Sequence, residues 1–76
     1  MVEPSRLPSA RESQVLTLVA RGSSDREIAN NLQLSPATVQ THVRNAKSKL
    51  GARTRAQAVA IAIQRGLISV DPAVPE

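Results

Sequence analysis

Three polar residues, Gln40, Thr41 and Arg44, have side chains that can read the edges of base pairs. Gln forms paired hydrogen bonds with adenine and Arg with guanine, and the methyl group of Thr packs on that of thymine. The three fall on one side of a helix expected over residues 36–50. With Val39 set at 0° on a helical wheel, they lie between about 100° and 200°. The spacing favours direct reading of double-stranded DNA, against the simpler interpretation of solvent-facing polar residues.

The charges of the chain are segregated in a way that also suits a polyanion. Lys and Arg number 10 and Asp and Glu 6, for a net charge of +4. No acid lies between Ile28 and Val70, and that span alone carries +6. Such a basic excess favours a polyanionic partner, either nucleic acid or an acidic membrane face, against the alternative of a solvated surface. Helix starts bind anions through their free N–H groups, so candidate phosphate contacts are the N-cap residues and the nearby cations: Ser24, Ser35, Thr54, Lys47, Lys49, Arg53 and Arg55.

The composition excludes several other classes of protein. The chain has no Phe, Trp or Tyr, and therefore no platform on which single-stranded bases stack. It has no Cys for a disulfide or a thiolate metal site, and its one His, His42, is expected to pack at the edge of the core. We find no pairing of nucleophile and base, so we predict no enzyme, no cofactor and no metal. No apolar run is long enough to span a membrane, and Met1–Ser9 lacks the apolar segment of a signal peptide.

Start and stop signals divide the 76 residues into helices and predict an all-α fold. Capping boxes are expected at Ser9, Ser24 and Thr54, each with Glu or Gln three residues later, and Ser35 precedes a proline. Glycines follow the first, third and fourth segments. The predicted helices are about 9–21, 24–32, 36–50 and 54–65. They form one domain over 9–68, with an N-terminal tail or linker at 1–8 and a C-terminal tail at 69–76. The apolar alternation over 58–63 can also be read as a strand, but its cap and glycine favour a helix.

The second and third predicted helices are separated only by residues 32–35. Two short helices with a tight turn, the second basic and narrowly amphipathic, form a helix-turn-helix unit. In such a unit the second helix lies in the major groove of DNA, and the first crosses the backbone.

Five stretches together resemble the LuxR-type helix-turn-helix domain, which is also found at the C-terminus of NarL/FixJ-type response regulators. They are LPSARESQVL at 7–16, VARG at 19–22, DREIA at 25–29, SPATVQTHV at 35–43 and KLGARTRAQAV at 49–59. The resemblance runs from about Leu7 to Ile68 and is nearly without gaps. It departs at Gln40, where many members carry a basic residue, and at Ala46, where a bulkier aliphatic is common.

The resemblance implies four helices and a bacterial transcription regulator that binds paired half-sites as a homodimer, in the cytoplasm and associated with the nucleoid. It assigns base contacts to Gln40, Thr41 and Arg44, and backbone contacts to Thr38, Lys47, Ser48 and the start of the fourth helix. It assigns dimer contacts to Ala58, Ile61 and Ala62, which we weigh against simple packing in the core. Most members carry a regulatory domain in front, so we expect either a short regulator or an excised domain. The competing class is a helical protein-interaction module that uses the apolar fourth helix.

Overall fold

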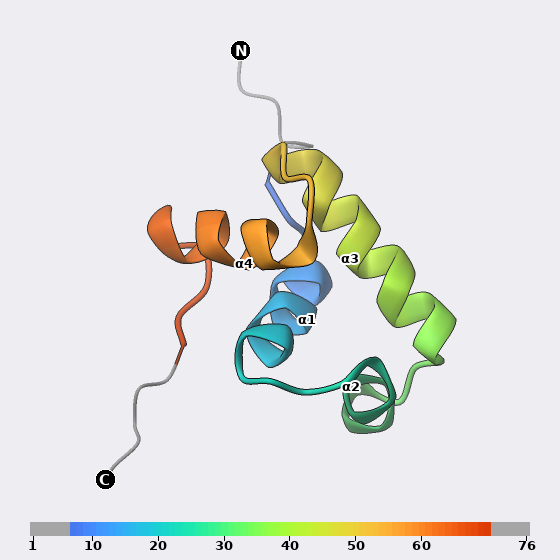
Figure 1. Ribbon diagram of the computed structural model, residues 1–76. Helices are drawn as coiled ribbons and strands as arrows, with labels where there is room; N and C mark the ends of the chain where they lie inside the picture. Colours follow the sequence, from blue (N-terminus) through green and yellow to red (C-terminus); the bar gives the residue numbers. More distant parts are fainter. Residues whose placement is uncertain (1–6, 71–76) are drawn as a thin grey trace, which may run out of the picture.

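The computed structural model describes residues 7–70 and consists of four helices (Figure 1). They are α1 (Ala10–Ala20), α2 (Asp25–Leu32), α3 (Pro36–Leu50) and α4 (Arg55–Gln64). Within residues 7–70 there is no strand, so the all-α prediction is confirmed and the strand reading of 58–63 is wrong. The outer parts of the two predicted tails, 1–6 and 71–76, lie outside the described residues.

Each helix begins at the cap residue that the sequence predicts. The Ser9 Oγ accepts the Glu12 N–H at 3.1 Å, and the Glu12 carboxylate accepts the Ser9 N–H at 2.8 Å. Ser24 and Glu27 form the same reciprocal pair at 3.1 and 2.8 Å. The Ser35 Oγ accepts from the third residue of α3, in which proline occupies the first position. These caps satisfy N–H groups that have no partner inside a helix.

The predicted capping box at α4 is only half formed. The Thr54 Oγ1 accepts a hydrogen bond from the Gln57 N–H at 3.0 Å. The Gln57 Oε1, however, accepts from the Arg53 N–H at 2.6 Å and not from the Thr54 N–H. Thr54 has a φ of −132°, whereas Ser9 and Ser24 have values of −67° and −75°. This rotation turns the Thr54 N–H away, so the amide of Gln57 binds one residue further back.

The turn between α2 and α3 is made without glycine. Gln33 follows α2 with a φ of 60° and a ψ of 46°, in the left-handed region. It is the one non-glycine residue among those described with a positive φ. The Leu34 N–H then donates to the Ala29 carbonyl at 2.8 Å, which closes the end of α2. The chain therefore reverses within three residues, and this short reversal completes the predicted helix-turn-helix unit.

The aliphatic core is divided into two clusters that share α1 and α3. One cluster, the α2-side cluster, consists of Val15, Ile28, Ala29, Val39 and Val43. The other, the α4-side cluster, consists of Leu16, Ala46, Leu50, Ala58, Ala62 and Ile68. The narrow apolar face predicted for α3 is confirmed, because Val39, Val43, Ala46 and Leu50 are all buried. Helix α3 is thus held from both ends of its inner face.

Helix α3 contacts all three other helices, while α2 and α4 do not approach each other through their backbones within residues 7–70. Figure 1 shows α2 beside the N-terminal end of α3 and the start of α4 beside its C-terminal half. This arrangement leaves the long outer side of α3 uncovered.

Candidate nucleic-acid interface

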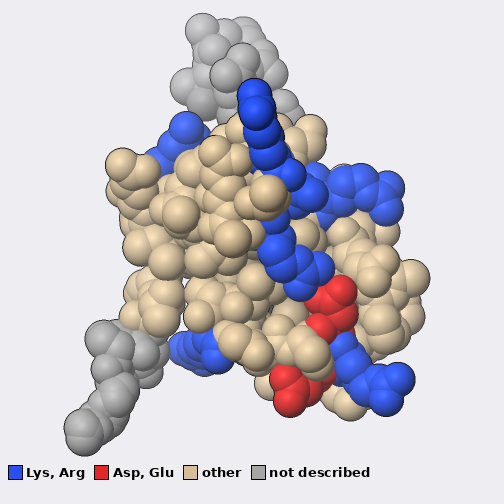
Figure 2. Space-filling view, in the orientation of Figure 1, with Lys and Arg blue, Asp and Glu red and all other residues tan. Residues whose placement is uncertain are grey.

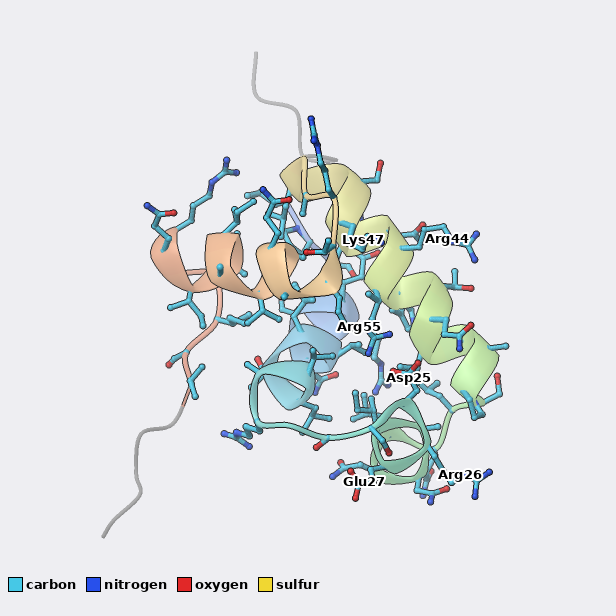
Figure 3. The ribbon with its side chains drawn as sticks, in the orientation of Figure 1. Asp25, Arg26, Glu27, Arg44, Lys47 and Arg55 are labelled. Carbon is cyan, nitrogen blue, oxygen red and sulfur yellow. The ribbon has the colours of Figure 1, made fainter. Side chains whose placement is uncertain are left out.

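The outer side of α3 presents the side chains that were predicted to read bases. Gln40, Thr41, Arg44 and Ser48 are all exposed, and Figure 3 shows Arg44 extending away from the helix. The Thr41 Oγ1 donates to the Ala37 carbonyl at 3.1 Å. Its hydroxyl hydrogen is therefore used within the helix, and its methyl group and oxygen lone pairs remain for contacts.

A concave surface, which we call the basic basin, lies between α3 and the start of α4. It has a volume of about 480 Å³. Its lining consists of Gln40, Val43, Arg44 and Lys47 from α3, and Arg53, Thr54 and Arg55 at the start of α4. Four of these residues are cations and none is an acid, and Figure 2 shows Lys and Arg gathered over this part of the molecule. The basin brings residues predicted to contact bases together with residues predicted to contact the DNA backbone.

The predicted backbone contacts at helix starts are also accessible. Ser24, Ser35 and Thr54 are exposed, and Thr38 is half-buried. Each capping oxygen accepts an N–H of its own helix, and the hydroxyls of Ser35 and Thr38 lie 3.0 Å apart. These hydroxyls are thus part of the helix ends that they cap.

Arg55, a predicted phosphate contact, is bound within the protein. Its guanidinium donates to both carboxylate oxygens of Asp25, at 2.7 and 3.2 Å, and Figure 3 shows the pair between α2, α3 and α4. The hydrogen bond from Arg55 holds the pKa of Asp25 below its ordinary value, and the same bond raises that of Arg55. Sequence reasoning missed Asp25, because no local pattern links residues 30 positions apart.

Lys49, another predicted phosphate contact, faces α1 instead of the outer side of α3. Its Nζ lies 2.9 Å from the Glu12 Oε1, and the Glu12 side chain is only 6 % exposed. Burial disfavours the charged form of Glu12, but hydrogen bonds from Lys49 and the Ser9 N–H outweigh it and lower the pKa. Lys49 lies at about 280° on the wheel used above, away from the reading face. The bond to Glu12 therefore turns Lys49 away from the reading face and joins α3 to α1, and its contact with DNA stays a prediction.

Two of the three predicted dimer contacts belong to the core. Ala58 and Ala62 are 0 % exposed and pack in the α4-side cluster, so neither offers a surface to a second chain. Ile61 is half-buried, and the one large apolar residue of α4 that is exposed is Ile63, at 42 %. A sequence that is apolar all round a helix does not reveal which side packs inward, and this explains the error.

His42 is packed at the core edge as predicted, but its Nδ1 is buried without a hydrogen-bond partner. Among residues 7–70 no three His, Cys, Asp or Glu side chains gather in a way that could hold a metal ion. The helices of this described part are all too short or too polar to cross a membrane.

The fold and this surface define a helix-turn-helix DNA-binding domain. Residues 8–62 match the family described as "Bacterial regulatory proteins, luxR family", and the chain belongs to this family. It is 47 % identical over 58 residues to the response regulator protein VraR of Staphylococcus aureus, and equally to that of Staphylococcus epidermidis. The match covers 76 % of this chain and 28 % of these relatives, so the chain spans little more than a quarter of their length.

A solved structure of the transcription factor GerE has the same fold. It superimposes with a TM-score of 0.77 at 33 % identity, over 80 % of this chain and 91 % of GerE. The resemblance that the sequence motifs indicate is thus confirmed, together with the class of DNA-binding transcription regulators.

Proposed function

We propose that the chain binds double-stranded DNA in a sequence-specific manner, with α3 in the major groove and the basic basin against the backbone. The observation that carries this proposal is the basin, which joins Gln40 and Arg44 to the cations Lys47 and Arg53 in one acid-free surface. Bases are read by hydrogen bonds in the groove, while phosphates fix the position of the protein. Both kinds of group are here on adjoining elements.

Within this surface we assign Gln40, Thr41 and Arg44 to base contacts. We assign backbone contacts to Lys47, Ser48 and Arg53, to the N-caps Ser24, Ser35 and Thr54, and to Thr38 in the first turn of α3, all of which are exposed or half-buried. Arg55 contributes to the basin wall through its pair with Asp25.

The relatives suggest the wider setting of this domain. We infer that it serves as the DNA-binding part of a response regulator, with a regulatory domain elsewhere in the protein, and that it works in the cytoplasm at the nucleoid. We also infer that it binds as a homodimer, with Ile61 and Ile63 of α4 as the apolar contact.

Selection of bound sites from a random duplex library tests the proposal directly. We expect one preferred sequence, present as two half-sites about one helical turn apart if the protein binds as a dimer. Affinity for the selected duplex should fall steeply with salt. A plot of the logarithm of the binding constant against the logarithm of the salt concentration should have a negative slope of about 0.9 for each phosphate neutralised. An unselective library or an affinity independent of salt would contradict the proposal.

Replacing Arg44 with Ala tests the reading face. Arg44 is exposed and forms no ion pair with any residue in 7–70, so its replacement should leave the fold intact. We expect binding to weaken by about 1–3 kcal/mol, with preference relaxed at one base pair. An equal loss on all duplexes would show that Arg44 binds phosphate instead.

A further inference from the structure

An acid stands beside the basic surface of this protein without lining it. Asp25 is the first residue of α2, and its carboxylate binds both terminal nitrogens of Arg55, which forms part of the basin wall. Both side chains are partly shielded, with exposures of 22 % for Asp25 and 39 % for Arg55. A carboxylate near a phosphate-binding surface repels the phosphates of DNA, so Asp25 must serve some role other than general attraction to DNA.

The pair joins two helices, α2 and α4, whose backbones do not approach each other in the described part of the chain. Helices α2 and α4 share no backbone contact there, and they belong to different core clusters. A two-pronged guanidinium–carboxylate bond fixes direction as well as distance. The Asp25–Arg55 pair therefore sets how the start of α4 stands relative to the helix-turn-helix unit.

Gln40 is next to this pair. Gln40 and Arg55 line the same basin, and an interaction with the Gln40 side chain adds to the lowered pKa of Asp25. An ionised carboxylate only accepts hydrogen bonds, so a carboxylate on this side of the basin favours the NH₂ end of the Gln40 amide over its oxygen. The amide oxygen and the second N–H then remain for a base, and these are the two groups that adenine requires.

We propose that Asp25 is a specificity-determining residue of DNA recognition: it ties Arg55 into the basin wall beside Gln40 and keeps this cation from phosphates on duplexes of any sequence. An arginine whose two terminal nitrogens both bond to a carboxylate adds little to the sequence-independent attraction of the protein to DNA. That attraction depends on the number of phosphates neutralised. A fixed neighbour also restricts the Gln40 amide. Asp25 thus weakens binding to unrelated DNA and strengthens the preference for the correct site. This inference rests on the proposed function, since it takes Gln40 as a base contact.

The test compares the native chain with Asp25→Asn on two duplexes of equal length, the selected site and a scrambled sequence. Asparagine keeps the size of the side chain but releases Arg55. We expect affinity for the scrambled duplex to rise about three- to tenfold, with a salt slope steeper by about 0.9. We expect the ratio of the two affinities to fall by at least about fivefold.

Glu27→Gln is the matched control, because it removes the same charge from the same turn of α2. Glu27 lies on the outer side of α2, away from Arg55 (Figure 3), and glutamine can still complete the capping box. The control should change both affinities by the same factor and leave their ratio unchanged. If Glu27→Gln lowers the ratio as much as Asp25→Asn does, the effect is one of net charge and the proposal is wrong.

Two further variants separate positioning from a general loss of structure. Arg55→Lys keeps the cation but not the two-pronged bond, and it should lower the ratio in the same way. In an Arg55→Gln background, Asp25→Asn should no longer steepen the salt slope, because no guanidinium is left to release. Melting followed by circular dichroism establishes that each variant is folded at the assay temperature.

The outcomes are distinct from those for the proposed function. If the native chain prefers no duplex, the proposed function fails and this inference fails with it. If the native chain is selective but Asp25→Asn and Arg55→Lys keep its ratio, only the role of Asp25 is overturned.

Discussion

Lys47 and Lys49 are only two positions apart on α3, yet they face different surroundings. Lys47 lines the basic basin, whereas Lys49 binds the buried carboxylate of Glu12. Two residues correspond to about 200° around a helix, which is enough to move a side chain from one face to the opposite one. We therefore expect the same charge to contribute to DNA binding at one position and to folding at the other.

Replacing each lysine with Gln should separate these contributions. We expect Lys49→Gln to lower the free energy of unfolding by about 1–3 kcal/mol, because the buried Glu12 carboxylate loses its charged partner. Its salt slope for DNA binding should stay unchanged. Lys47→Gln should instead reduce that slope by about 0.9 and weaken binding to all duplexes alike. Urea titrations and binding isotherms distinguish the two, and a reduced slope for Lys49→Gln would contradict the structure.

Glu12 should make the stability of the protein depend on pH in the acid range. Its pKa in the folded state is lowered from the ordinary value of 4.5. The unfolded chain therefore binds this proton more tightly than the folded protein does. The stabilisation from Glu12 is therefore complete above about pH 4.5, and it is lost as the pH falls through the pKa of Glu12 in the folded protein. Glu12→Gln, which keeps the capping pattern, should flatten this dependence. Unfolding free energies measured from pH 7 to pH 3 for both proteins provide the test, and parallel curves would refute it.

At the scale of elements, the turn of the helix-turn-helix unit contains a strained residue. Gln33 has a φ of 60°, where a side chain costs about 1–2 kcal/mol. Glycine removes that cost but makes the unfolded chain more flexible. We expect Gln33→Gly to raise the free energy of unfolding by about 0.5–1 kcal/mol, and Gln33→Val to lower it. Thermal melts of the two variants show the sign, and an unstable Gln33→Gly would mean that the Gln side chain supports the turn.

The helices were predictable because their signals are local. Ser9, Ser24 and Ser35 bind N–H groups within the next three residues, so the caps can be read directly from the chain. The outer face of α3 was predictable for the same reason, since it is the complement of a regular apolar stripe. Which of the assigned residues contact DNA stays a prediction.

What the sequence could not reveal depends on contacts between distant residues. The bonds Lys49–Glu12 and Arg55–Asp25 join residues 37 and 30 positions apart, and both redirect a cation that charge counting assigns to phosphate. The inward side of α4 is a second example. Alanine alternates with valine and isoleucine over residues 58–63, and only the packing of α1 and α3 determines that Ala58 and Ala62 are the buried residues.

At the scale of the whole molecule, the small aliphatic core makes stability sensitive to ligands. A domain of this length buries a modest fraction of its surface, so its stability is marginal. DNA that binds only the folded state raises the free energy of unfolding by about 2.7 kcal/mol when its free concentration is 100 times its dissociation constant. We therefore expect the melting temperature to rise with the concentration of the selected duplex, and this rise to shrink in high salt. Calorimetry at two salt concentrations measures both effects, and a melting temperature unaffected by the duplex would argue against binding to the folded domain.

The division of the core has a consequence for how the molecule opens. Within the core, helix α2 packs in the α2-side cluster alone and α4 in the α4-side cluster alone, and the Asp25–Arg55 pair links the two helices outside the core. The protein can therefore lose α2 from its place without dismantling the packing of α1, α3 and α4, as cooperative subunits of folding do. Amide protons of α2 should then exchange with solvent through a partial opening, ahead of those in the C-terminal half of α3. If α2 opens in this way, we expect α3 to keep its support from α1 and α4 while α2 adjusts to the curvature of a bound groove.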